Sequence, residues 1–70
     1  MEKILAHLDY GVNRSAVAEF EIYAAGSRTG IKIILEDEGS EDATKTVAFL
    51  KLQAFLEDAL KTVQEKLRAL

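Results

Sequence analysis

The chain contains no cysteine and no proline, and it has only four glycines and one histidine among its 70 residues. Without cysteine, neither disulfide bonds nor a thiolate zinc site can stabilise it. The length of 70 residues predicts a single domain, residues 1–70, and is close to the lower limit for an independent hydrophobic core. A chain of this size without such supports often gains stability by associating with another chain.

The composition also lacks the features of membrane proteins and of general nucleic-acid binders. The formal net charge of −3 argues against binding to nucleic acids or to anionic membranes. No apolar run reaches the length of a membrane span, and the segment Met1–His7 is too short and polar for a signal peptide, so we expect a cytoplasmic protein. A charged fraction of 30%, with one Asn, two Gln and one Met, favours a thermophilic source.

The dominant pattern lies between Glu41 and Leu70, where apolar residues recur at the three- and four-residue steps of one helix face. This apolar stripe comprises Phe49, Leu52, Leu56, Leu60, Val63, Leu67 and Leu70. Ser40 is suited to cap the helix, and acidic residues in the first turn with basic residues in the last turn suit the helix dipole. We therefore predict one long amphipathic helix, with the first forty residues organised to cover its stripe.

Three shorter segments predict β-strands. Lys3–Tyr10 and Ile31–Glu36 alternate between two sets of side chains, as half-buried strands do. Ala16–Ala25 alternates as well, although a short helix capped by Ser15 is an alternative for this segment. Gly26–Gly30, with a glycine at each end, is expected to be a five-residue hairpin connection.

The predicted fold is therefore α+β in the order β-β-β-α. A three-stranded antiparallel β-meander packs one face against the single long C-terminal helix, and the other face is left to water. The polar residues expected on that outer face are His7, Asp9, Glu19, Glu21, Lys32 and Glu36. The apolar residues expected to share it are Leu5, Val17, Tyr23 and Ile34.

The predicted helix is longer than the predicted sheet. A helix of about 28 residues spans roughly 42 Å, whereas a strand of about eight residues spans roughly 26 Å. The excess end carries Val63, Leu67 and Leu70 on the apolar stripe, so we expect another surface to cover them.

A second apolar group lies on the side of the helix that should be solvated. It comprises Val47, Leu50 and Ala54, with Phe55 as a neighbour. Scattered apolar residues on a protein surface are normal and are the alternative explanation. Together with the excess helix end, these residues predict a partner interface, with the helix or an exposed sheet edge as the contact.

No combination of residues predicts catalysis, a cofactor or a metal site. His7 and Asp9 share a strand face and could act in acid–base chemistry, but the pair has no nucleophile or further ligand nearby in sequence. Residues 36–42 contain five acids and no base, yet they lack the spacing of an EF-hand loop. A solvated start of the helix and a site for a hard cation both stay open for this run. We expect a protein that is not an enzyme.

A small nucleic-acid-binding module is the alternative function. Three strands followed by a helix resemble the core of a double-stranded RNA-binding domain. That family carries lysines where its last helix begins and has a helix ahead of its first strand, whereas this helix begins with Ser40–Asp42 and the leading helix is missing. The basic residues form no stripe that would follow phosphates, which argues against direct nucleic-acid binding.

The segment Ile31–Val63 is similar in pattern to the end of the small dimerisation subunits of the KEOPS tRNA-modification complex. Those proteins end in a strand, an acidic turn and a long helix, which Ile31–Glu36, Asp37–Asp42 and Phe49–Leu52 match here. The family inserts a helix between its first two strands. Either Ser15–Ala25 is that helix or the chain resembles a reduced paralogue.

The resemblance implies a non-catalytic subunit that pairs with itself or with a paralogue. It also implies docking to a larger catalytic subunit that modifies tRNA to threonylcarbamoyladenosine. Together with the excess helix end, it predicts a small subunit that dimerises and scaffolds a larger assembly, with no cofactor of its own.

Overall fold

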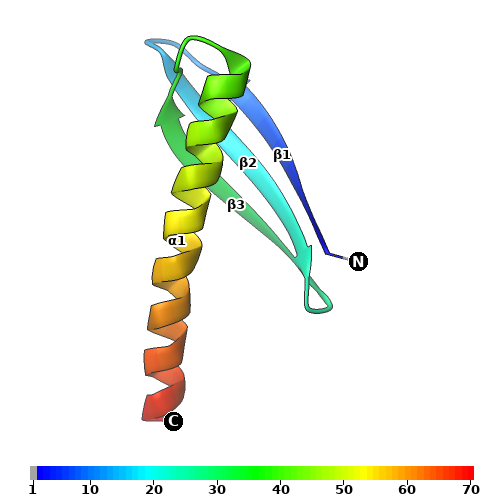
Figure 1. The fold of residues 1–70 in the computed structure, drawn as a ribbon, viewed down its shortest axis with the longest axis vertical. Helices are drawn as coiled ribbons and strands as arrows, with labels where there is room; N and C mark the ends of the chain where they lie inside the picture. The colour runs from blue at the N-terminus through cyan, green and yellow to red at the C-terminus, as the bar shows by residue number, and fades with distance from the viewer. Residues whose placement is uncertain (1) are drawn as a thin grey trace.

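A computed structural model describes residues 2–70 (Figure 1). The chain forms, in order, β1 (Lys3–Tyr10), β2 (Ser15–Ala24), β3 (Ser27–Glu36) and α1 (Glu41–Ala69). The strands make one antiparallel sheet in the order β1-β2-β3, and α1 crosses one face of it. The predicted β-β-β-α fold is confirmed, and the segment for which a helix was the alternative is a strand.

The strand register places one parity set of β2 beneath α1. Ala16, Ala18 and Phe20 are each 1% exposed and, with Leu35 of β3, form the sheet side of the core. Phe20 is the only large side chain in the middle strand that is fully buried, and its ring packs edge-on against Phe49 with the ring centroids 5.1 Å apart. The core is therefore centred on β2.

The outer face of the sheet carries the polar set that the alternation predicts. In the ladder, Glu19 lies between His7 and Lys32, and Lys32 Nζ is 3.4 Å from Glu19 Oε1. His7 Nε2 lies 3.0 Å from Asp9 Oδ1 on the same face. Ile34 of this face is 78% exposed, so the chain itself leaves the outer face open to water.

The hairpin between β2 and β3 is tighter than expected. The predicted connection over Gly26–Gly30 is wrong, because only Ala25 and Gly26 separate the two strands. The angle φ is 52° at Ala25 and 75° at Gly26, and positive values at both central residues are typical of a two-residue type I′ turn. Gly30 instead pairs with Glu21 inside the ladder.

We expect Ala25→Asn to raise the free energy of unfolding by roughly 0.5–1 kcal/mol. Asn tolerates the left-handed conformation that costs a residue such as alanine about 1 kcal/mol, and Asn-Gly is the preferred sequence of this turn. Urea unfolding followed by circular dichroism measures the change. Ala25→Val is the control and should destabilise the hairpin, since a β-branched side chain fits this conformation poorly. A destabilised Ala25→Asn variant would contradict this description of the turn.

A buried threonine joins the turn after β3 to the start of α1. The hydroxyl of Thr44 accepts a hydrogen bond from the Glu38 N–H at 3.0 Å and donates one to the Ser40 carbonyl oxygen at 2.8 Å. Ser40 is the predicted N-cap, and its Oγ accepts from the Ala43 N–H at 3.1 Å. Asp37 Oδ1 lies 3.3 Å from Thr44 Oγ1. The start of the helix and the preceding turn thus share one hydrogen-bond network.

Replacing Thr44 with valine keeps the shape of the side chain and removes its hydroxyl. We expect the free energy of unfolding to fall by about 1–3 kcal/mol, because the Glu38 N–H loses its partner in a part-buried position. Thr62→Val is the matched control, since Thr62 is exposed and its hydroxyl donates only to the Asp58 carbonyl oxygen. It should change stability by less than about 0.5 kcal/mol. Equal effects of the two substitutions in urea unfolding would contradict the role given to Thr44.

Helix α1 uses only its first half to pack on the sheet. Its buried residues are Thr44, Ala48 and Leu52. Beyond Leu52 every residue is exposed except Ala59, which is partly buried. Figure 1 shows the C-terminal part of α1 extending past the end of the sheet. The predicted excess of helix over sheet is therefore confirmed.

Candidate protein-interaction surface

The apolar stripe of α1 does not face the sheet along its whole length. The residues that do face it are Thr44, Ala48 and Leu52. Continued along the helix at about 100° per residue, this row passes through Ala59 and reaches Lys66. Most of the stripe is turned from this row by roughly 80°. The expectation that the stripe as a whole packs on the sheet is therefore wrong, and only Leu52 does so fully.

Next to this row, the stripe and β1 line an open apolar groove of about 460 Å³. The residues of this β1–α1 groove are Ile4, Phe49, Leu52, Gln53, Leu56, Glu57 and Leu60. Leu52 is 2% exposed and belongs to the core, whereas Phe49 and Leu56 are each 40% exposed and Leu60 is 57% exposed. The groove therefore lies next to the buried core and is lined on its outer side by apolar side chains that are largely exposed.

The groove exists because one helix is too narrow for three strands. A helix with its side chains is about 10–12 Å wide. Three strands about 4.8 Å apart need cover over roughly 15 Å. Helix α1 packs over β2 and β3, whereas Ala6 and Leu8 of β1, which point to the same side, are only partly buried against the core. Ile4 and Tyr10, near the two ends of β1, are 44% and 49% exposed.

Beyond the groove the stripe continues as three exposed residues, which we call the distal stripe. Val63, Leu67 and Leu70 are 53%, 63% and 100% exposed, and no other part of residues 2–70 covers them. Groove and distal stripe together form one continuous apolar band along α1. Contiguous exposed apolar surface of this kind marks interaction sites.

The other predicted interface residues lie elsewhere on α1. Val47 is partly buried against the core, near β3. Leu50 is 59% exposed, Ala54 is exposed, and Phe55 is 52% exposed. Val47, Leu50 and Ala54, which we call the far-flank patch, are thus separated from the distal stripe by the helix itself. The seven residues predicted from the sequence do not form one surface.

The groove adds residues that the sequence analysis did not place in an interface. Phe49, Leu56 and Leu60 were expected to be covered by the sheet, and Ile4 was expected on the core side of its strand. The sequence does contain a signal for this arrangement. The small residues Thr44, Ala48 and Ala59 lie on a side of the helix that is rotated from the stripe, and small residues are favoured where a helix packs closely on a sheet.

The acidic turn before α1 is held in place by hydrogen bonds of Asp37. The Asp37 N–H donates to the Arg14 carbonyl oxygen at 2.7 Å, and the Arg14 guanidinium donates to the Asp37 carbonyl oxygen at 3.4 Å. Asp37 Oδ1 accepts from the Gly39 N–H at 2.9 Å, and φ is 95° at this glycine. Among residues 2–70, no three His, Cys, Asp or Glu side chains lie close enough together to hold a metal ion.

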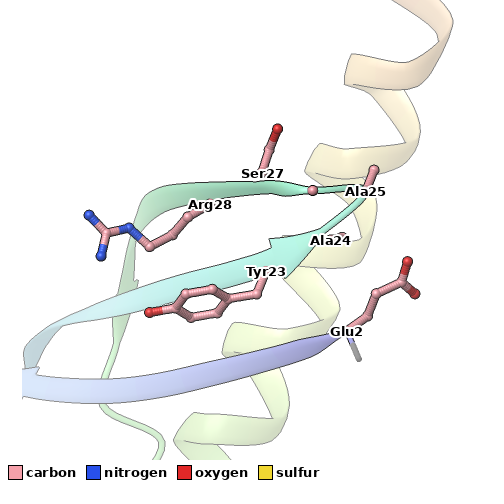
Figure 2. A pocket seen from close by; sticks show the side chains of 7 residues that line it. Glu2, Tyr23, Ala24, Ala25, Ser27 and Arg28 are labelled. Carbon is pink, nitrogen blue, oxygen red and sulfur yellow. The ribbon is translucent and has the colours of Figure 1, made fainter.

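A second hollow, of about 510 Å³, lies beside the β2–β3 turn (Figure 2). Figure 2 shows that Tyr23 and Arg28 extend in the same direction, away from the carboxylate of Glu2. The Tyr23 hydroxyl donates to Glu21 Oε2 at 2.9 Å, and the Lys3 ammonium lies 5.0 Å from the centre of the Tyr23 ring. Tyr23 thus pairs with Glu21 and Lys3 along the sheet, whereas Arg28 and Glu2, which also line the hollow, extend in opposite directions.

Within residues 2–70, no helix combines the length and apolar character needed to cross a membrane. Comparisons of the chain with protein-family models, with curated proteins and with solved structures found no match. The functional conclusion therefore depends on the geometry of the apolar band.

Proposed function

We propose that this protein is a small non-catalytic subunit that dimerises and scaffolds a larger assembly. The observation that carries the proposal is the apolar band of groove and distal stripe, which runs from Phe49 to Leu70 along α1 and includes Ile4 of β1. In a monomer, a helix that continues for several turns beyond its sheet with exposed leucines adds no apolar burial to the core. In a subunit of an assembly, the same leucines provide a contact surface for another chain.

The small core supports the same conclusion. Among residues 2–70 only six apolar residues are buried, and three of them are alanines: Ala16, Ala18, Phe20, Leu35, Ala48 and Leu52. A chain of this length buries a smaller fraction of its surface than larger domains do, and association is one of the ordinary ways to add the missing stability. Covering the band with a second chain would supply the apolar burial that the isolated fold lacks.

The open sheet provides further contact surfaces. Both β1 and β3 are edge strands, so each presents a row of backbone N–H and C=O groups that no other strand of the described chain, residues 2–70, pairs with. The resemblance to KEOPS dimerisation subunits concerns β3, the acidic turn and α1, which are the elements next to one edge and the band. On that reading the partner is a second copy or a paralogue, and the larger subunit that it joins modifies tRNA.

Light scattering from micromolar to sub-micromolar protein tests the proposal, with circular dichroism on the same samples. We expect a mass of at least twice the 7.7 kDa of one chain at the higher concentrations. Helical signal should fall on dilution, because the dimer and the fold stabilise each other. A folded 7.7-kDa monomer at every concentration would contradict dimerisation.

The melting temperature distinguishes the apolar band from the far-flank patch. For a dimer the melting temperature rises with protein concentration. Leu67→Glu should abolish this rise, because it places a charge in the distal stripe. Leu50→Glu is the matched control, since Leu50 is 59% exposed and Leu67 63% exposed on the same helix. If only the Leu50→Glu variant lost the concentration dependence of the melting temperature, the interface would lie at the far-flank patch instead.

A further inference from the structure

We infer that the distal stripe of a second copy of this chain fills the β1–α1 groove, so that two α1 helices run antiparallel about a two-fold axis near residues 59 and 60. The inference rests on the proposed dimerisation and specifies its geometry. Each copy would donate its distal stripe and receive that of the other.

The spacing of the stripe residues is symmetric about the point between Ala59 and Leu60 once Ala59, which belongs to the sheet-facing row, is counted with them. With Ala59 included, the steps between successive stripe residues are 3, 4, 3, 1, 3, 4 and 3, which read the same in both directions. A two-fold interface requires that residue i contacts j while j contacts i. An antiparallel register in which facing residue numbers add up to 119 meets this condition. The facing pairs are Phe49–Leu70, Leu52–Leu67, Leu56–Val63 and Ala59–Leu60.

This register joins the two parts of the apolar band. In the first three pairs, one residue lines the groove and the other belongs to the distal stripe. The groove side of α1, from Phe49 to Leu60, is roughly 17 Å long, and the segment from Leu60 to Leu70 is roughly 15 Å long. The empty space over β1 therefore has about the length of the helix end that lacks a neighbour.

The area of the band agrees with the size of a stable interface. Its large residues outside the core are between 40% and 100% exposed, and they are Ile4, Phe49, Leu56, Leu60, Val63, Leu67 and Leu70. Together they present on the order of 800 Å² per copy, which is the typical contribution of one partner to a stable interface. A second copy covers this area without any further component.

Disulfide trapping tests the geometry directly, because the natural chain has no cysteine. Leu60→Cys places one thiol per copy beside the two-fold axis, where facing helix backbones approach closely enough for a disulfide. Under mild oxidation we expect its covalent dimer to form roughly 100-fold faster than that of Leu50→Cys at micromolar protein, because facing thiols have a high effective concentration. Equal rates for the two variants would overturn the inference.

A mixture of two variants tests the direction of the helices. Phe49→Cys and Leu70→Cys chains should crosslink to each other and not to themselves. Crosslinking of Phe49→Cys with itself would show parallel helices and would overturn the inference, although light scattering would still report a dimer and the proposed function would stand. A wild-type monomer at all concentrations that associates only with a paralogue would overturn the inference as well.

Discussion

The fold depends on a mismatch of dimensions between one helix and one small sheet. A single helix covers about two strands, so the third strand keeps part of its apolar face accessible. The same helix has 29 residues, and only Thr44, Ala48 and Leu52 of them are buried. The sheet is too wide for the helix and the helix too long for the sheet. The groove and the distal stripe are the two consequences, and one neighbour of suitable shape can remove both.

Much of this architecture is predictable from the sequence. Strand alternation, the Ser40 cap and the helical period of the stripe are local patterns, and each appears in the structure, although β3 begins four residues before the predicted Ile31. Local patterns do not determine the rotation of the helix on the sheet. Phe49 and Leu56 share a stripe with Leu52, yet only Leu52 is buried, because the small residues Thr44 and Ala48 permit the closest approach. The hairpin was predicted, but its two-residue turn was missed because alanine occupies a position that usually belongs to Asn or Asp.

The polar groups are used mainly to build the fold. Thr44 and Asp37 organise the acidic turn, Tyr23 pairs with Glu21, and Lys32 pairs with Glu19 across strands. The exposed apolar residues, by contrast, form a continuous band with a symmetric sequence pattern. The polar side chains named here thus take part in structural hydrogen bonds and ion pairs, whereas the exposed apolar surface favours a function that depends on contact with other chains.

Hydrogen exchange of the α1 amides after Ala59 is the most direct measurement of the central idea that a second chain covers the C-terminal half of the helix. In the structure every residue of this segment is exposed, so an isolated chain would leave its amides to exchange by local fraying. We expect strong protection at high protein concentration that is lost on dilution, in parallel with the dimer mass. Rapid exchange of these amides at every concentration would contradict it.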